Sequence, residues 1–208
     1  MNIRVDTQFP VAFDSPDHLH PWGTINDNHS NSNFIDEVFT YFNNDIKSFL
    51  DIGCSGGKLV RDISEKGIIS VGIEGSDVSA KAGRAEWADL YNINLFTCDA
   101  SRPYTIYNDD ELLKFDCITA WEVIEHIHPD RLDTFFLNIY NHLSDRGIFV
   151  GSISMKNDNP EGVELHLSVF SRDHWETKIL NKYLKVSAYP FVHKVRDEES
   201  SFYVLLRK

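Results

Sequence analysis

The sequence predicts an α/β fold in which helices cover both faces of one doubly wound, mostly parallel sheet. Three observations support this prediction. Short apolar runs alternate with amphipathic helical patterns, as they do in parallel sheets joined by crossover helices. A glycine-rich turn, Gly53–Gly57, follows the first of these runs. Several runs end on an acidic residue, which is typical of strands whose ends carry a ligand site.

Composition limits the size, partners and location of the protein. The 208 residues are 42% apolar, which suffices for one globular domain with a substantial core. The formal charge of −12 repels phosphate backbones and disfavours nucleic acid as a partner. No apolar stretch approaches the roughly 20 residues of a membrane span, and no signal-peptide pattern is present. With Cys54, Cys98 and Cys117 expected to be reduced, buried thiols, the sequence predicts a cytoplasmic protein.

Residues 1–29 form an N-terminal segment that is rich in His, Pro, Asp and Asn and is expected to be irregular. Two interpretations of this segment stay open. It is either a surface segment that packs its aromatic side chains on the domain, or a lid over an active site. Residues 30–208 are expected to form a single domain, because they contain no internal repeat and no low-complexity tract.

The first half of this domain alternates helices and strands. Apolar residues at helical spacing predict a helix over 34–42. The apolar run 47–51 ends on an aspartate and predicts the first strand, and a helix over 57–66 then stops at the next glycine. The run 68–74 predicts the second strand, after which Asp77 can cap a helix that continues to about Leu90.

The second half continues the alternation. Residues 93–98 predict the third strand, and a polar loop over 101–110 leads to a fourth strand at 115–121. An amphipathic stripe over 132–143 predicts a helix. The fifth strand is expected to begin at Ile148, after a turn of Asp, Arg and Gly.

The C-terminal part of the chain predicts one more helix and two strands. Residues 171–183 have the spacing of an amphipathic helix, and the runs 184–189 and 202–206 predict the last two strands. The short return between these strands suggests an antiparallel hairpin. The complete prediction is a Rossmann-like sheet of seven strands, mostly parallel with an antiparallel last strand.

The carboxyl ends of the parallel strands should meet at one edge of the sheet. Right-handed crossovers place Asp51, Glu74, Asp99 and the pair Trp121–Glu122 along the same crevice. Glu74 stands about where a nucleotide-binding βαβ unit carries the carboxylate that binds ribose hydroxyls. The converging polar strand ends therefore predict a nucleoside-containing cofactor.

Two cofactors are compatible with this architecture, a nicotinamide dinucleotide and S-adenosylmethionine. The dinucleotide fingerprint Gly-x-Gly-x-x-Gly is absent, because Cys54 and Ser55 follow Gly53 and the middle glycine is missing. Asp51 would also place a carboxylate close to a pyrophosphate, which it would repel. The sequence therefore favours S-adenosylmethionine over a dinucleotide.

Asp51-Ile52-Gly53-Cys54-Ser55-Gly56-Gly57 resembles the first motif of the class I S-adenosylmethionine-dependent methyltransferases, Asp/Glu-x-Gly-x-Gly-x-Gly. Ser55 departs from this pattern, since it replaces a glycine. The segment 115–127 resembles the family's fourth-strand segment, and the terminal strand pair resembles its reversed last strand. The resemblance extends over residues 34–207.

The resemblance implies that S-adenosylmethionine is the cofactor and S-adenosylhomocysteine the product. Backbone groups around Gly53 would hold the methionine end, and Asp51 would receive the ammonium group. Glu74 would accept both ribose hydroxyls, while Asp99 and Ala100 would bind adenine. The full set of implied cofactor-binding residues is Asp51, Gly53, Cys54, Ser55, Gly56, Glu74, Gly75, Asp99, Ala100 and Trp121.

Methyl transfer from a sulfonium is an in-line displacement, so the protein mainly aligns the reactants and excludes water. A hydroxyl acceptor benefits from a base, and His126, which is expected to titrate near neutrality, is the favoured candidate. Glu122 and His166 are the other candidate catalytic residues. The alternative is that these side chains cap the crevice and have a structural role.

The sequence favours O-methylation of a small polar acceptor, such as a sugar or a natural-product hydroxyl. The acceptor pocket is expected to form between the aromatic residues Phe9, Phe13 and Trp22 and the region 152–170. Oxygen or nitrogen as the acceptor atom stays open, and so does the oligomeric state.

Two alternatives remain beside this prediction. Glu122, Glu125, His126 and His166 resemble the metal ligands of the RNA 2′-O-methyltransferases of the Hen1 type. A divalent metal is therefore compatible with the sequence, but it is not favoured and no metal ligand is assigned. The second alternative is a noncatalytic scaffold that binds the cofactor.

Overall fold

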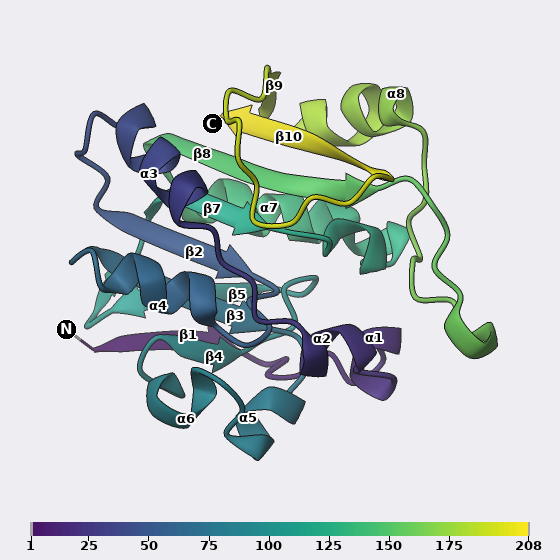
Figure 1. The fold of residues 1–208 in the computed structure, drawn as a ribbon, viewed down its shortest axis with the longest axis horizontal. Coiled ribbons are helices and arrows are strands. Elements are labelled where there is room, and N and C mark those ends of the chain that lie inside the picture. The colour runs from purple at the N-terminus through teal and green to yellow at the C-terminus, as the bar shows by residue number, and fades with distance from the viewer. Residues whose placement is uncertain (1, 208) are drawn as a thin grey trace.

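A seven-stranded sheet of order β4-β3-β2-β7-β8-β10-β9 forms the centre of the protein, described here for residues 2–207 by a computed structural model (Figure 1). The pairs from β4 to β8 are parallel, whereas β10 runs antiparallel to both of its neighbours. The predicted fold class is confirmed. The strands of this sheet are β2 (Ser48–Ile52), β3 (Ile69–Glu74), β4 (Leu95–Thr97), β7 (Phe115–Ala120), β8 (Leu143–Ser154), β9 (Lys185–Ser187) and β10 (Ser201–Arg207).

Helices cover both faces of the sheet. The helices are α1 (Pro16–Leu19), α2 (Trp22–Asn26), α3 (Ser32–Tyr41), α4 (Lys58–Ser64), α5 (Val78–Ala82), α6 (Trp87–Leu90), α7 (Leu132–His142) and α8 (Arg172–His174). The 3-10 helices are η1 (Ile124–His126), η2 (Pro129–Arg131), η3 (Pro160–Gly162) and η5 (Leu180–Lys182), and η4 (Trp175–Ile179) is a π-helix.

Successive residues of the central strands point to opposite faces and form two separate cores. Phe49 and Cys117 pack in one core with α3 and α4, whereas Leu50 and Ile118 pack in the other with α7 (Figure 1). Every residue of β2 and β7 is buried. Strands covered on both faces are mostly apolar, which is why the positions of β2 and β7 can be predicted from the sequence.

A second, three-stranded sheet contradicts two of the predictions. β1 (Ile3–Thr7) pairs antiparallel with β5 (Tyr104–Asn108), which also pairs with β6 (Glu111–Leu112). The expectation of irregular structure is therefore wrong for these N-terminal residues, and the expectation of a polar loop over 101–110 is wrong for β5. The pairing joins segments about a hundred residues apart in sequence, so no local pattern reveals it.

The expected helix from Asp77 to about Leu90 is divided into α5 and α6. Gly83 ends α5 in the left-handed conformation at φ 57°, and Ala85 has φ 49°, so the helical path cannot continue. The C-terminal helix is likewise divided, into α8, η4 and η5. β8 already begins at Leu143, five residues before the expected Ile148.

The cysteines have the state that the sequence predicts. Cys54, Cys98 and Cys117 are all buried and free, as the sequence predicts. Burial raises the pKa of the Cys98 thiol to about 12, so this thiol does not act as a nucleophile near neutral pH. Within residues 2–207, no helix combines the length and the hydrophobicity that crossing a membrane requires.

Candidate functional site

A pocket of about 750 Å³ lies at the carboxyl ends of the parallel strands. Its size falls within the roughly 300–1,000 Å³ of pockets that bind small molecules and cofactors. Strands β2, β3 and β7 and the turn after β4 contribute most of the residues that were predicted to form the site. Those that line the pocket are Gly53, Ser55, Glu74, Gly75, Asp99, Ala100, Trp121, Glu122, His126 and His166.

Three residues of the predicted cofactor site lie behind the pocket wall. Asp51 is 5% exposed, and its Oδ1 accepts a hydrogen bond from Thr119 Oγ1 at 2.7 Å. Burial raises the pKa of Asp51 to about 7, although the bond from Thr119 opposes this change. Cys54 packs in an apolar cluster with residues of α4 and α6. A Cβ atom on Gly56 would lie 2.2 Å from Oδ1 of Asn28, which covers it.

The turn after β2 depends on backbone that only glycine adopts easily. Gly53 has φ 73°, and a Cβ atom there would lie 2.4 Å from Cγ2 of Val123. Ser55 has φ 46°, also in the left-handed region, although it carries a side chain. The turn therefore brings backbone groups of Gly53 and Ser55 to the pocket surface, where a bulkier residue at position 53 would not fit.

Glu74 is fixed at the end of β3 by two backbone amides. Its Oε2 accepts from the Ser55 N–H at 2.9 Å, and its Oε1 accepts from the Ser76 N–H at 3.1 Å. Burial raises the pKa of this carboxyl, and the two amide bonds act in the opposite direction. A carboxylate has about four acceptor positions, so both oxygens can still accept hydroxyl groups of a ligand.

Asp99 follows β4 and has a similar arrangement. Its Oδ1 accepts from the Ser101 N–H at 2.9 Å and from Ser101 Oγ at 2.6 Å. The Asp99 N–H donates to the carbonyl of Phe9 at 2.9 Å. These bonds set the direction of the Asp99 carboxylate at the adenine end that the resemblance implies.

His126 contacts a carboxylate that sequence reasoning missed. Its Nδ1 lies 2.8 Å from Oδ2 of Asp17, and the two side chains form an ion pair when the imidazole is protonated. Burial lowers the pKa of His126, but Asp17, Glu125 and Glu122 raise it to about 9. The expectation that His126 titrates near neutrality is therefore wrong. Nothing in the local sequence links Asp17 to a histidine more than a hundred positions away.

His166 lies beside His126, with ring centroids 4.7 Å apart. Its Nδ1 donates to the carbonyl of Lys156 at 2.6 Å, because a carbonyl can only accept. In the neutral ring this leaves Nε2 with a lone pair. The N–H groups of Leu167 and Ser168 both donate to the Glu125 carbonyl, at 2.8 and 2.9 Å, which holds the two segments together.

Glu125 is fully buried, and neither of its carboxylate oxygens has a hydrogen-bond partner among the described residues. Burial raises the pKa of Glu125 to about 8. One ligand atom from each of Glu125, His126 and His166 lies within 4.8 Å of the others. This donor set of one carboxylate and two imidazoles fits a divalent transition metal. Glu122 does not belong to the group.

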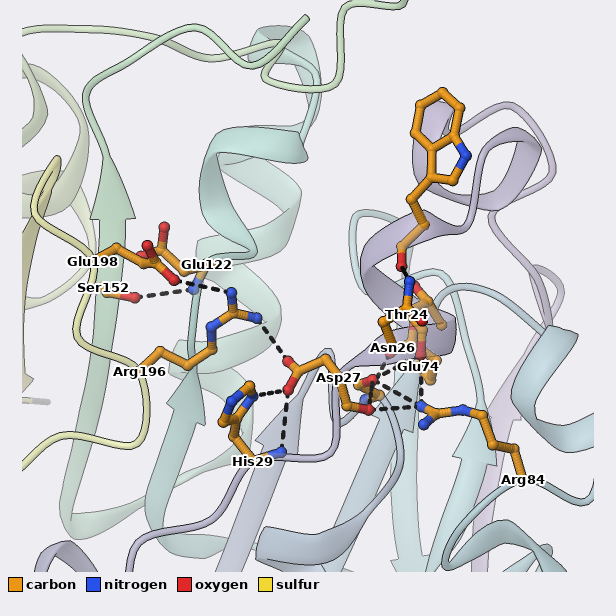
Figure 2. A network of polar contacts seen from close by, with 12 residues as sticks. Thr24, Asn26, Asp27, His29, Glu74, Arg84, Glu122, Ser152, Arg196 and Glu198 are labelled. Carbon is orange, nitrogen blue, oxygen red and sulfur yellow. Dashed lines mark hydrogen bonds and ion pairs between the residues drawn. The ribbon is translucent and has the colours of Figure 1, made fainter. Parts of the chain in front are cut away.

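Glu122 follows β7 in a strained conformation, with φ 53°. Its N–H donates to Ser152 Oγ at 2.9 Å (Figure 2), which holds this backbone in place. Its Oε1 is buried without a hydrogen-bond partner in the described part of the chain. Glu122 therefore presents an unsatisfied acceptor at the pocket wall.

Residues 8–29, between β1 and α3, cross the pocket and are called the covering segment below. They contribute Ala12, Asp14, Ser15, Asp17, His18, Trp22, Gly23, Thr24 and Asp27 to the lining. Of the aromatic residues expected in the acceptor pocket, only Trp22 is part of this lining, since Phe9 and Phe13 point to solvent. The expected region 152–170 contributes Ser154, Lys156, Asn157, Asp158, Pro160, Leu165, His166 and Leu167.

Known proteins share this fold. The family model for a methyltransferase domain matches residues 50–149, and no curated protein matches the sequence. The PH0226 protein from Pyrococcus horikoshii OT3 is 16% identical, with 92% of this chain and 98% of that one covered and a TM-score of 0.64. The glycopeptide N-methyltransferase MtfA, solved with S-adenosylmethionine, is 13% identical, with 85% and 88% covered and a TM-score of 0.55. The methyltransferase domain of a bacterial Hen1 protein is 20% identical, with 84% and 95% covered and a TM-score of 0.55.

Proposed function

The chain belongs to the class I S-adenosylmethionine-dependent methyltransferases, and we propose that it O-methylates a small polar acceptor such as a sugar or a natural-product hydroxyl. One observation carries this proposal. A single pocket joins the carboxylates of Glu74 and Asp99 to the cluster of Glu122, His126 and His166. The two carboxylates suit an adenosyl cofactor. The cluster suits an acceptor hydroxyl that must lose its proton during methylation.

S-adenosylmethionine supplies an activated methyl group when it is bound, and S-adenosylhomocysteine is the product. Glu74 would accept both ribose hydroxyls, and Asp99 with the Ala100 backbone would bind adenine. Backbone groups of Gly53 and Ser55 hold the methionine end, while Gly75 and Trp121 complete the wall. The Asp51 carboxylate lies below the turn and behind the pocket lining, so it would influence the methionine end of the cofactor without forming part of the pocket surface.

The acceptor hydroxyl is proposed to lie against His166 and Glu122. Nε2 of His166 is the acceptor atom of the neutral ring, so it can take the hydroxyl proton. His126 carries a proton at neutral pH in the free protein, because its pKa is raised to about 9. It must lose this proton before it can act as a base, so we propose a mainly electrostatic role for His126 at pH 7.

Residues 1–29 are proposed to act as a lid on the domain formed by residues 30–208. The support is that the covering segment lines the pocket over much of its length. A cytoplasmic location belongs to the same proposal and rests on the free, buried cysteines.

Calorimetry and a methyl-transfer assay test this function. S-adenosylmethionine should bind with micromolar affinity, and S-adenosylhomocysteine should compete with it. A panel of sugars and phenols, matched with their amine analogues, then separates oxygen from nitrogen as the acceptor atom. Absence of cofactor binding would contradict the enzyme and the noncatalytic cofactor-binding scaffold alike. Binding without transfer to any acceptor would favour the scaffold.

A second candidate is metal-dependent 2′-O-methylation of RNA, as in the Hen1 type. The observation in its favour is the grouping of Glu125, His126 and His166. A divalent metal held there would lower the pKa of an acceptor hydroxyl. The net charge of −12 opposes binding to RNA. Methylation of a 3′-terminal ribose that requires Mn²⁺ and is abolished by chelation would establish this candidate over the small acceptor.

A further inference from the structure

We propose that Ser55 and Arg84 form a latch that holds the covering segment closed over the cofactor pocket, so that cofactor enters and leaves only when the latch opens. The second half of this proposal rests on the proposed function. Arg84 lies outside the pocket lining and carries none of the roles assigned above. The latch therefore adds a control of cofactor exchange that is separate from the chemistry of methyl transfer.

The covering segment presents two backbone carbonyls to the latch. Ser55 Oγ lies 2.9 Å from the Thr24 carbonyl oxygen and 2.8 Å from that of Asp27. Arg84 Nη2 donates to the same two oxygens, at 2.5 and 2.8 Å (Figure 2). Ser55 Oγ also lies 3.0 Å from Nη2 and can share one of its two hydrogens. The hydroxyl has one hydrogen and can satisfy one carbonyl, so the guanidinium is needed for the other.

Ser55 is the residue that departs from the glycine pattern of the family motif. Its φ of 46° is less favourable for serine than for glycine. What the serine adds is a hydroxyl group, and the described contacts of that hydroxyl are to the covering segment and to Arg84. The serine at position 55 thus provides the first hydrogen-bond donor of the latch.

Both latch residues are held rigidly on the domain. Arg84 Nε donates to Ser79 Oγ at 3.1 Å, and Ser79 is fully buried. The Ser55 carbonyl accepts from Trp87 Nε1 at 2.6 Å. Because these supports come from α5 and α6, the latch does not depend on the covering segment for its own position.

Asp27 extends the closure to the opposite side of the pocket. Its carboxylate accepts from Arg196 Nη1 at 2.7 Å, and Arg196 also binds Glu198 at 3.2 Å. Arg196 belongs to the connection between β9 and β10. Figure 2 shows Asp27 between Arg196 on one side and Arg84 on the other. The segment is therefore fastened to both walls through one residue.

The latch meets the cofactor site at Ser55, which also lines the pocket. The Ser55 N–H donates to Glu74 Oε2 at 2.9 Å, so the proposed ribose carboxylate and the latch share this residue. Trp22, Thr24 and Asp27 line the same pocket as Glu74. With the segment closed, a cofactor bound at Glu74 is covered, and its release must wait for the segment to open.

Hydrogen exchange of the cofactor-free protein tests the latch itself. Arg84→Gln and Ser55→Gly should each accelerate exchange of amides 22–29 by about ten-fold, the effect of one charge-assisted hydrogen bond. Arg172→Gln is the matched control, because Arg172 is exposed on α8 and pairs with Glu176 of η4. Ser55→Gly also restores the family's glycine, so misfolding cannot explain its effect. Unchanged exchange in both variants would overturn the latch.

Stopped-flow measurement with S-adenosylmethionine tests the control of exchange. In Arg84→Gln, both the association and dissociation rates should rise about ten-fold while Kd changes by less than three-fold, since opening is faster in both directions. Faster amide exchange with unchanged dissociation would overturn the gating role. If the unaltered protein does not bind S-adenosylmethionine, the proposed function and the gating role both fail, whereas the hydrogen-exchange result for the latch still stands.

Discussion

Nδ1 of His126 lies 2.8 Å from Oδ2 of Asp17, which joins the helical turn after β7 to the covering segment. Asp17 is one of the carboxylates that raise the pKa of His126. Asp17→Asn should therefore lower this pKa below its value of about 9, which NMR titration of the His126 ring proton measures. Asp130→Asn is the control, since Asp130 faces the exposed His128 at 3.7 Å. An unshifted His126 titration would mean that the covering segment does not reach this site in solution.

Glu74→Gln should weaken binding of S-adenosylmethionine by about ten- to a hundred-fold, because the amide loses a charged acceptor for the ribose hydroxyls. One end of the new amide would also face the N–H of Ser55 or Ser76 as a second donor. Calorimetry measures the change. The Glu176→Gln variant, which changes a partly exposed glutamate of η4, should bind as the unaltered protein does. Equal affinity of the two variants would remove Glu74 from the cofactor site.

Gly53→Ala should lower the free energy of unfolding by about 1–3 kcal/mol, because it combines a strained φ with overpacking. The new Cβ would lie 2.4 Å from Cγ2 of Val123. Adding Val123→Ala should recover part of the loss, since it removes that atom. Urea denaturation of the two single variants and the double variant gives the coupling energy. Strictly additive effects would mean that the two residues do not meet.

Glu125→Gln should weaken Mn²⁺ binding at least ten-fold if the buried donor set holds a metal. The reason is that both oxygens of Glu125 lack partners and lie near the two imidazoles. Calorimetry with Mn²⁺ alone gives this result without any assay of activity. Glu122→Gln is the comparison, because Glu122 lies outside the group. No Mn²⁺ binding by the unaltered protein would dismiss the metal-dependent candidate.

Because of His142, the free energy of unfolding should decrease as the pH falls from about 6.5 to about 4. Burial lowers its pKa to about 4, against the bond to the Asn138 carbonyl, and the ring stays neutral under Tyr104. The unfolded chain binds a proton in this window and the folded protein does not, which costs on the order of 3 kcal/mol at the acid end. His142→Gln, whose side-chain carbonyl can still accept from the Ile106 N–H, should show less of this loss in urea denaturation. If the free energy of unfolding decreased equally in the unaltered protein and in His142→Gln, other titratable groups would be responsible for the effect.

The sequence predicts the main sheet well where burial is complete. β2 and β7 are covered on both faces, so most of their residues are apolar, although Asp51 and Asp116 interrupt the runs. It fails for β1 and β5, because their partners lie far apart in the chain. Short strands of mixed polarity do not differ locally from a polar loop.

The candidate site also contains residues that the sequence predicts and residues that it does not. The strand-end residues Glu74 and Asp99 are predictable, because topology alone brings strand ends together. Asp17, Arg84 and Arg196 are not, since each lies on a loop or short helix and makes its contacts with residues far away in the sequence. The raised pKa of His126 has the same origin, because it needs Asp17 beside it.

The pairing of β1 with β5 fixes the covering segment at its start. Its other end enters α3, where Asn31 Nδ2 donates to the Lys194 carbonyl at 2.8 Å. A chain held at both ends explores far fewer conformations than a free tail, so bringing it back costs little entropy. Re-closing is then an intramolecular event at high effective concentration. A few hydrogen bonds are therefore enough to favour the closed form.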